Sequence, residues 1–495
     1  MNLQKPRRAC VRSLAWVRER VGYSAESICN IFHIAPERRD AFVARLLAHR
    51  IIRRRNTTGA AEANDDEVFE NYLSQAEYAF CYVGMYACND CMVYILPKYA
   101  DTQKLAVPEP AGETSTTSRE RRELFIQVLK AIRRYHSKRL ESELHAEQEN
   151  PICNDLALLV TIVSDFAEHG EYRNEHQIEQ VNGPGRHMWS HTINKKLALI
   201  QHESPIYTDI ITRQRTREHN NPITLLHRRI VSECHASLAQ FGLTELLDLP
   251  ANSVEESPAP ENDSDNYLLY LVESELSRQF DSRRRHILNL LKAYLSCQSS
   301  RQQDSEPEYA FGCSSFHMLW EDACRTVLGE DISGQLQIKS PVWSMKQQVH
   351  EAPSSLIPDM IFSTEHGTWI IDAKYYLPLP GRAGNMPLGL PGTNDITKQF
   401  LYQQALLRPA AHHNSGRTIR QPVRNAFLMP APLSAAEPEH VQHYATVSMP
   451  LFPQLKIEVL QVAPHALFAC YTGQASPAPL RSQLTQLIAQ DIYPE

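Results

Sequence analysis

Residues 356–376 contain two apolar runs around which the rest of the chain can be organised. Both runs are rich in β-branched and aromatic residues, which is typical of β-strands. Between them, Glu365 and His366 precede a glycine, so the pattern predicts a hairpin. A symmetric hairpin with this turn places Asp359 opposite Asp372. The apolar residues of the two runs are Met360, Ile361, Phe362, Trp369, Ile370 and Ile371.

Asp359 and Asp372 would be two like charges ~5 Å apart across the hairpin, an arrangement that destabilises a sheet unless something compensates it. A sheet buried on both faces rarely carries unpaired acids without a function. Mg²⁺, for which Mn²⁺ can substitute, is often held by one or two carboxylates with water and substrate phosphate. Strand alternation puts Lys374 on the face of Asp372 and turns Ala373 away. The pattern therefore predicts a metal site that can approach a phosphodiester.

The alternative interpretation is that Asp372 and Lys374 form an ordinary ion pair at a solvated strand end, which is worth little. An Asp-x-Lys pattern alone is too short to be specific. The combination is more informative, because Pro358–Asp359 opens one predicted strand, Asp372 and Lys374 close the next, and apolar residues fill both faces between them. This combination favours a functional site.

Pro358–Asp359 followed by Asp372-Ala373-Lys374 resembles the motif of the PD-(D/E)xK nucleases, whose fold is a mixed sheet flanked by helices. The wider sequence resembles the LlaJI-type restriction endonuclease family, which is related in its nuclease part to the McrC subunit. That similarity covers most of the chain. Its specific stretches are residues 77–99, 178–193, Tyr375–Tyr376, Pro391–Gly392 and 394–402.

The resemblance implies a Mg²⁺-dependent endodeoxyribonuclease that cuts double-stranded DNA. Lys374 would orient or deprotonate the attacking water, and Gln399 and Tyr402 would support the site, with Tyr402 near enough to contact DNA. Gln399 and Tyr402 are three residues apart, where related nucleases more often have four. The metal ligands that the resemblance implies are Asp359, Asp372, the Ala373 carbonyl and Glu321; for Glu321, an ordinary surface position is the alternative.

No G-x-x-x-x-G-K-[ST] pattern occurs, so the chain carries no P-loop of its own. In a motor-driven restriction system, as the resemblance implies, the McrB-like AAA+ GTPase would be a separate protein. We therefore expect the nuclease subunit of a restriction, or phage-defence, system. The alternatives are a stand-alone site-specific restriction enzyme, a catalytically idle DNA-binding or scaffold subunit, and a nuclease acting on RNA. Whether the protein forms a homo-oligomer stays open.

Length and composition indicate a multidomain protein, for which we expect the α/β class. A chain of 495 residues is too long for one core. The longest apolar stretch, 156–163, is far short of a bilayer span, and no signal-peptide pattern opens the chain, so we expect a cytoplasmic protein without a membrane segment. Eleven scattered cysteines, an odd number, fit reduced thiols in a reducing compartment.

Residues 1–55 are basic, with thirteen Lys or Arg against four acidic residues, although the whole chain has a formal net charge of −7. A local basic patch can bind phosphate even on an acidic protein. Apolar spacing predicts helices at 7–21, at 24–32 and from Pro36, followed by a strand at 51–55. Three short helices and a basic strand suggest a winged helix; the alternatives are a small helical cap and a protein-contact module. The expected DNA-binding residues are Arg53, Arg54 and Arg55.

Residues 67–248 are expected to form a mixed α/β middle domain. Cys88 and Cys91 make a lone C-x-x-C, and His187 and His191 a lone histidine pair. Neither pair supplies a full ligand set, so packing or surface roles are the commoner interpretation. The predicted elements are two strands within 77–99 that turn at Asn89–Asp90, a charged helix at 119–149, a hairpin at 178–193 around Asn182–Gly183, a strand at 206–216 and a helix at 222–240.

The polar, Pro-rich stretch 249–266 predicts a linker, and a long helix at 267–297 should follow it. Residues 249–310 would thus separate the middle domain from a nuclease domain at 311–495. The first helix of that domain should be capped by Ser314 or Ser315 and bury one stripe. A helix at 395–407 should follow Lys374. The expected stripe consists of Phe316, Trp320, Ala323 and Val327.

Overall fold

The structure is a computed structural model of a mixed α/β, multidomain protein. The chain forms two compact units: unit 1 combines Met1–Arg139 with Glu306–Glu495, and unit 2 is Leu140–Ser305. No helix in the described part of the chain is both long and apolar enough to cross a bilayer. The residues described are 13–54, 77–88, 91–100, 116–143, 155–173, 175–202, 204–217, 221–249, 264–300, 308–329, 336–339, 342–345, 348–351, 358–378, 389–408, 412–414, 419–432 and 440–489.

The N-terminal part of unit 1 is built on a four-stranded sheet in the order β1-β6-β5-β12. The strands are β1 (Ser13–Arg18), β6 (Cys91–Leu96), β5 (Val83–Cys88) and β12 (Glu308–Cys313). β1 pairs in parallel with β6, so the prediction of a helix at 7–21 is wrong for the part of it that is described. The apolar spacing there fits a strand as well as a helix, and pairing with β6 decides between them.

Two helices and a small sheet cover this part of unit 1. Ser24 caps α1 (Ala25–Ile31) as predicted, because its Oγ accepts a hydrogen bond from the Ser27 N–H. η1 (Pro36–Arg38) and α2 (Arg39–Ala48) follow, and β2 (Gly22–Tyr23), β4 (Tyr78–Phe80) and β3 (Ile52–Arg54) form a sheet. The three-helix arrangement that suggested a winged helix is therefore not formed in the described residues.

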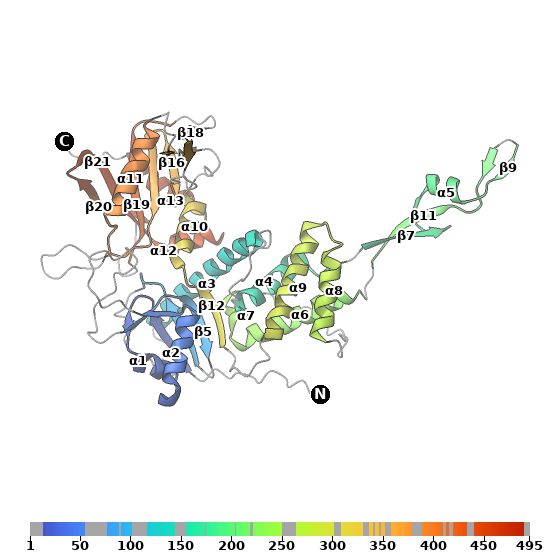
Figure 1. Ribbon diagram of the computed structural model, residues 1–495, viewed down its shortest axis with the longest axis horizontal. Helices are drawn as coiled ribbons and strands as arrows, with labels where there is room; N and C mark the ends of the chain where they lie inside the picture. Colours follow the sequence, from blue (N-terminus) through green and yellow to red (C-terminus); the bar gives the residue numbers. More distant parts are fainter. Residues whose placement is uncertain are drawn as a thin grey trace. The chain divides into compact units, whose positions relative to one another are not determined.

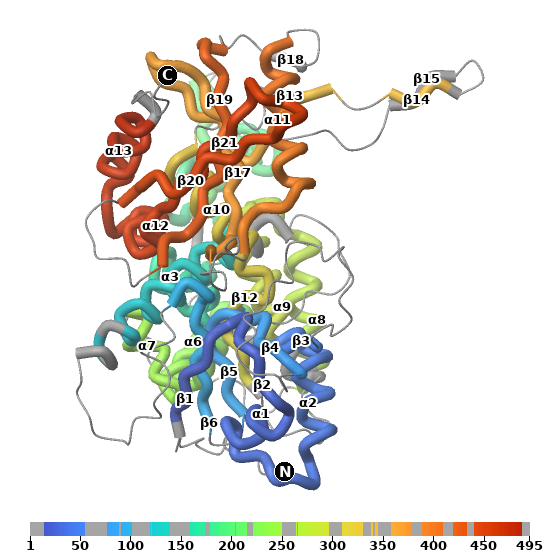
Figure 2. The backbone as a smooth tube through the Cα atoms, turned by 90° about the vertical axis from the view of Figure 1, so that its left-hand side faces the viewer, coloured from blue at the N-terminus to red at the C-terminus, as the bar shows by residue number. Residues whose placement is uncertain are grey.

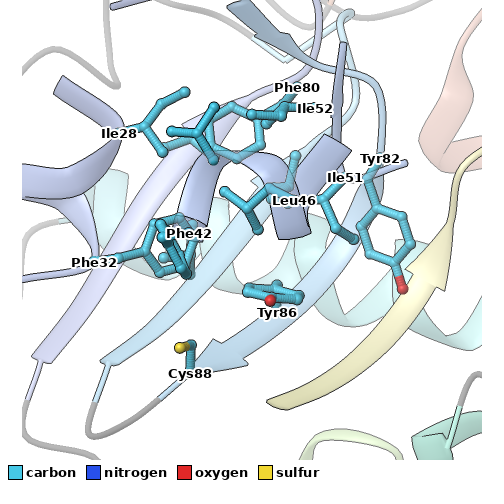
Figure 3. Packing of buried hydrophobic residues seen from close by; sticks show 14 of the residues in the cluster. Ile28, Phe32, Phe42, Leu46, Ile51, Ile52, Phe80, Tyr82, Tyr86 and Cys88 are labelled. Atoms are coloured by element: carbon cyan, nitrogen blue, oxygen red, sulfur yellow. The ribbon is translucent and has the colours of Figure 1, made fainter. Parts of the chain in front are cut away.

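The helices α1 and α2 share one core with β5, as Figure 3 shows. Phe32 packs edge-on against both Phe42 and Tyr86, at ring-centroid distances of 5.1 and 5.6 Å. Cys88 and Cys91 are buried in this core and face each other where β5 and β6 end and begin. Packing is thus the role that the structure supports for the C-x-x-C pair.

The charged helix predicted at 119–149 is α3 (Thr116–Glu143), and it links the N-terminal sheet to the C-terminal part of unit 1. Its buried side includes Phe125, which packs 5.5 Å from Trp16 of β1. Gln127 donates a 2.7 Å hydrogen bond to the His465 carbonyl. Several charged side chains of α3 are exposed, among them Arg119 and Glu123, while Gln127 contacts the C-terminal part of unit 1. The last predicted residues, 144–149, lie outside those described.

The C-terminal part of unit 1 is a mixed five-stranded sheet in the order β16-β17-β19-β21-β20. The three central strands are parallel and both edge strands antiparallel. Figure 2 shows this sheet between α11 and the helices α12 and α13. The bounds are β16 (Met360–Thr364), β17 (Gly367–Ala373), β19 (Val423–Pro430), β20 (Val441–Met449), β21 (Phe452–Val462), α10 (Phe316–Leu328), α11 (Thr393–Leu406), α12 (Pro464–Tyr471) and α13 (Ala478–Ala489).

The helices of this part agree with the sequence. α10 begins after Ser315, and all four residues of the expected stripe are buried, although Ser315 makes no side-chain capping hydrogen bond. α11 covers almost the whole predicted helix at 395–407. Two small ladders complete the part, β13 (Leu336–Ile338) with β18 (His412–Asn414) and β14 (Val342–Met345) with β15 (Gln348–Glu351).

Unit 2 is a group of packed helices that carries an arm of strands (Figure 1). The helix predicted at 222–240 is α6 (Pro222–Gln240). The helix predicted at 267–297 is instead two helices, because Asp281 caps a new one by accepting the Arg284 N–H at 2.9 Å. The helices are α4 (Asp155–His169), α6, α7 (Leu243–Leu246), α8 (Asp265–Leu276) and α9 (Ser282–Ser300).

The hairpin predicted at 178–193 is wrong, since both of its strands pair with a third strand, β11. Asn182 does make a left-handed turn, but its side chain accepts the Ile210 N–H and donates to the Thr208 carbonyl, which directs β7 onto β11. The elements of the arm are β7 (Glu175–Val181), β8 (Arg186–His187), α5 (Trp189–Lys195), β9 (Leu199–Gln201), β10 (Ser204–Ile206) and β11 (Ile211–Arg217).

His227 of α6 should make the stability of unit 2 depend on pH. The side chain is buried, its Nδ1 accepts the Tyr172 N–H at 2.9 Å, and burial lowers its pKa to about 4. Between about pH 6.5 and pH 4, the unfolded chain binds a proton at this histidine and the folded chain does not. The free energy of unfolding should therefore have its full value at neutral pH and fall by up to about 3 kcal/mol as the pH approaches 4.

Urea unfolding of the wild type and of His227→Gln at pH 7.5 and pH 4.5 measures this contribution. Glutamine keeps an acceptor for Tyr172 and cannot titrate, so the variant should lose less stability on acidification than the wild type. An equal loss in both proteins would show that His227 is not the group responsible.

Candidate active site

The hairpin of β16 and β17 has the predicted register. Met360 pairs with Ile371 at one end and Thr364 with Gly367 at the other, so Glu365 and His366 form the turn. One step beyond the ladder, Asp359 lies opposite Asp372. Asp359 Oδ2 accepts a 3.0 Å hydrogen bond from the Ala373 N–H, which fixes this carboxylate at the end of β17.

Lys374 lies between two carboxylates. Its Nζ is 3.0 Å from Asp372 Oδ2 and 2.8 Å from Asp395 Oδ1. Burial alone would lower the pKa of Lys374, but attraction to Asp372 and Asp395 outweighs it and raises the pKa, so the group is held as an ammonium. An ordinary surface ion pair is excluded, because the Asp372 side chain is only 4% exposed.

Asp395 was missed by the sequence reasoning. It lies in the first turn of α11, within the stretch 394–402 that carries the family resemblance. An acidic residue at a helix start is usually explained by the helix dipole, so nothing in its position singled it out. The structure shows that it is the second partner of Lys374.

The three predicted acids interact electrostatically. Burial, followed by repulsion from Asp372 and Glu321, raises the pKa of Asp359 to about 7. Burial also raises the pKa of Glu321 on α10. Attraction to Lys374 lowers this pKa and repulsion from Asp372 raises it. The structure thus brings Asp359, Asp372, Glu321 and Lys374 together. Arg325 of α10 helps to fix Asp359, because its Nε donates a 3.2 Å hydrogen bond to the Asp359 carbonyl.

These residues fit a hard divalent cation. Within the residues described, no three His, Cys, Asp or Glu side chains are already arranged around a metal position. The donor chemistry nevertheless matches, since the available groups are carboxylate oxygens with the Ala373 backbone beside them. Burial first, and then repulsion from Asp372 and Glu321, raise the pKa of Asp359, and a bound cation would offset both effects.

Gln399 supports the site through the backbone. Its Nε2 donates to the Ile370 carbonyl at 2.8 Å and to the Ala426 carbonyl at 3.3 Å, so it joins β17 to β19 two residues before Asp372. Its Oε1 is buried and has no hydrogen-bond partner among the described residues. The supporting role predicted for Gln399 therefore has a structural basis in these two strands.

Tyr402 is placed differently from what we expected. Only 1% of it is exposed, so the ring is not on a surface that DNA could contact. Burial raises the pKa of its hydroxyl, which hydrogen-bonds to Lys398. Lys398 is exposed on the same helix, one turn earlier, with its Nζ 5.5 Å from the Tyr402 ring centroid. The exposed basic group here is Lys398, held by Tyr402.

The other predicted residues do not join this group. Arg53 and Arg54 are part of β3 in the small three-stranded sheet β2-β4-β3, with Arg54 exposed, and Arg55 lies outside the described residues. His187 is on β8, whereas His191 is on α5 with its Nδ1 3.1 Å from Glu179, so the two histidines do not share a strand face. The surface interpretation of the histidine pair is supported.

Comparison with known proteins decides the family. The sequence profile of the LlaJI restriction endonuclease family matches residues 82–464. The chain belongs to this family. The matched range contains the β16–β17 hairpin, α10 and α11, so every acid of the candidate site and Lys374 lie within it. The prediction that the chain is a LlaJI-type restriction endonuclease is confirmed at the level of the family.

The chain is also similar to individual known proteins. The LlaJI-family chain is 24% identical over 370 residues to the type II restriction enzyme BsuMI component YdjA of Bacillus subtilis (strain 168), covering 72% of this chain and 74% of the relative. Among solved structures, it is similar to a chain in the half-complex of Thermococcus gammatolerans McrB AAA+ hexamers with bound McrC, with 13% identity, 96% and 100% coverage and a TM-score of 0.40. A chain of the McrBC complex of the same organism covers 56% and 79%, with 13% identity and a TM-score of 0.23.

Proposed function

We propose that this member of the LlaJI family is a Mg²⁺-dependent endonuclease of the PD-(D/E)xK type that hydrolyses phosphodiesters of double-stranded DNA. One observation carries the proposal: Asp359 and Asp372 lie in register across the hairpin, with Lys374 Nζ 3.0 Å from Asp372. Two carboxylates and a lysine on one strand end form a site for a hard cation and an anionic substrate. The alternative of an idle scaffold gives no reason to keep these like charges together.

Asp359 and Asp372, with Glu321 and the Ala373 carbonyl beside them, would hold the Mg²⁺. A bound Mg²⁺ supplies charge neutralisation at the phosphate and acidifies a water. Lys374 would donate a hydrogen bond to the attacking water or to a phosphate oxygen and stabilise developing negative charge. Because two carboxylates hold Lys374 as a cation, orienting rather than deprotonating the water is the role that its contacts favour.

The protein would work as the nuclease subunit of a restriction system with a separate McrB-like AAA+ GTPase. The chain has no P-loop, so a motor would have to come from another protein. The alternative, a stand-alone site-specific enzyme, needs no such partner. Cleavage assays with and without the product of a neighbouring GTPase gene, in the presence of GTP, separate the two.

Plasmid nicking with Mg²⁺, with Mn²⁺ and with EDTA tests the activity itself, alongside a structured RNA of similar length. Metal-dependent nicking of DNA alone supports the proposal. Cleavage of RNA but not DNA would assign the site to an RNA nuclease. Binding of DNA without any cleavage, under all metal and nucleotide conditions, would leave the scaffold function.

Charge reversal at Arg53, Arg54 and Arg55 should weaken DNA binding and flatten its salt dependence. Each lost phosphate contact lowers the slope of log affinity against log salt by roughly one unit. Fluorescence anisotropy with labelled duplex between low and moderate salt measures the slope. Lys195→Glu, an exposed position on α5 of unit 2, is the control for a change in net charge. A slope unchanged by the three reversals would favour a protein-contact role for this segment.

A further inference from the structure

Two residues that follow strands of the N-terminal sheet contact Tyr375, the residue directly after the candidate catalytic lysine. Building on the function proposed above, we propose that Glu19 and Lys98 are positioning residues of the nuclease site, which fix Tyr375 and Tyr376 and through them Lys374. Glu19 follows β1 and Lys98 follows β6, more than two hundred residues before the hairpin. All of these residues belong to unit 1.

Tyr375 is held from the N-terminal side at three points. Its hydroxyl donates to Glu19 Oε1 and lies 3.2 Å from the Lys98 backbone nitrogen. The Lys98 ammonium donates to the Tyr375 carbonyl and lies 4.0 Å from the centroid of its ring, a cation–π distance. Tyr375 directly follows Lys374 in the chain. A contact that fixes its ring, hydroxyl and carbonyl therefore also fixes the backbone from which the Lys374 side chain leaves.

A second route reaches Lys374 through the next tyrosine. The Lys98 Nζ lies 5.7 Å from the Tyr376 ring centroid. The Tyr376 hydroxyl donates to Asp395 Oδ2 at 3.3 Å, and the other oxygen of Asp395 is 2.8 Å from Lys374 Nζ. The Lys98 ammonium thus lies near both tyrosine rings. Tyr375 fixes the backbone next to Lys374, and Tyr376 fixes Asp395, the carboxylate partner of Lys374.

The N-terminal side of these contacts is well anchored. Glu19 is 4% exposed, its N–H donates to the Leu96 carbonyl at 2.9 Å, and its carboxylate accepts the Lys98 N–H at 3.0 Å. Arg18 Nη1 donates to the carbonyls of Lys98 and Ala100 at 3.0 and 3.1 Å. Side chains fixed in this way suit a supporting shell, which must hold catalytic groups to within about half an ångström.

The strand itself gives Lys374 less support. β17 ends at Ala373, and residues 374–378 form no regular element. The Lys374 N–H still donates to the Leu428 carbonyl, so the support from the sheet ends at this residue. Since a displacement of about 1 Å can cost on the order of 100-fold in rate, the contacts beyond Lys374 become important for catalysis.

The test uses the full chain with the variants Lys98→Met, Lys98→Arg and Glu19→Gln in single-turnover DNA cleavage with Mg²⁺. Lys98→Met should lower the rate at saturating DNA at least tenfold and leave the half-saturating DNA concentration unchanged. Lys98→Arg keeps a donor and a cation over the rings and should recover most of the rate. Glu19→Gln should fall in between, since it keeps an acceptor for Tyr375.

The matched control is Ile95→Ala, which truncates a buried side chain of the N-terminal core on the strand leading to Lys98. It should lower the unfolding temperature and leave the cleavage rate unchanged. A loss of rate in Ile95→Ala equal to that in Lys98→Met would show that Lys98 acts through stability alone, and a rise in half-saturating DNA with an unchanged rate would make Lys98 a DNA contact. Either result overturns the proposal.

A second measurement does not depend on activity. The Lys98 ammonium lies against the rings of Tyr375 and Tyr376, and Asp395 accepts the Tyr376 hydroxyl. The losses in unfolding temperature from Lys98→Met and Asp395→Asn should add if the two residues act independently. We expect the double variant to lose clearly less than the sum, because both changes release the same tyrosines. Strict additivity contradicts the linkage. If the wild type cuts no DNA, the nuclease function fails, while this cycle still decides whether the two residues are coupled.

Discussion

Replacing Lys374 or Asp372 with alanine should reduce DNA cleavage by at least about 100-fold, the scale on which removing one charge-stabilising group acts. Lys374 Nζ forms ion pairs with Asp372 at 3.0 Å and with Asp395 at 2.8 Å. Its charge can therefore serve the transition state without being needed for the hydrophobic core. Lys374→Ala leaves two carboxylates without their cation, so some loss of stability should accompany the loss of activity.

The measurement is plasmid nicking over a range of enzyme concentrations, with thermal unfolding of each variant to show that the fold survives. Glu365→Ala is the matched control, because Glu365 is at the turn of the same hairpin with an 81% exposed side chain. It should cleave like the wild type. Full activity in either Lys374→Ala or Asp372→Ala would show that the hairpin does not form the catalytic site.

Replacing Asp359 with asparagine should remove most of the stabilisation that Mg²⁺ or Mn²⁺ gives to the wild type. A ligand that binds only the folded state stabilises it by RT ln(1 + [M]/Kd), which is ~2.7 kcal/mol at a hundredfold excess over Kd. Asparagine keeps an oxygen that can accept the Ala373 N–H, as Asp359 Oδ2 does at 3.0 Å, but it has no charge for the cation. Most of the metal-dependent gain should therefore disappear.

Without metal, the same variant should be at least as stable as the wild type. Asp359 and Asp372 repel each other in a poorly solvated setting, and the substitution ends that repulsion. Thermal unfolding of both proteins with EDTA and with millimolar Mg²⁺ gives the four values required. Equal metal-induced shifts in the two proteins would place the cation elsewhere in the molecule.

The register of the β16–β17 hairpin could be predicted from sequence, because a two-residue turn and two apolar runs leave one symmetric pairing. α10 could be predicted as well, since its apolar residues form one buried stripe. Asp395 could not, because its partner Lys374 is distant in sequence and a helix start is an ordinary place for an acid. Local patterns identify residues whose neighbours are local.

The errors share one cause, which is a distant partner. Residues 13–18 could follow a helical or a strand period, and only the parallel strand β6 makes them a strand. Asn182–Gly183 is a turn signal, but the Asn182 side chain bonds to residues 208 and 210, so the turn leads to β11 and not to its own neighbour. The burial of Tyr402 likewise depends on the sheet under α11.

The pairing of β12 with β5 determines when the N-terminal sheet can be completed during synthesis and which fragments of the chain can fold. Residues 308–313 complete the N-terminal sheet, yet the ribosome adds them only after the whole of unit 2. Until then the outer side of β5 is an open strand edge, which can pair with other chains. A fragment that stops before residue 308 should therefore aggregate, whereas removal of residues 140–305 with a short bridge between the cut ends should leave a soluble unit. Unit 2 is thus an insertion in the sequence of unit 1, and unit 1 needs the residues on both sides of it to complete its fold.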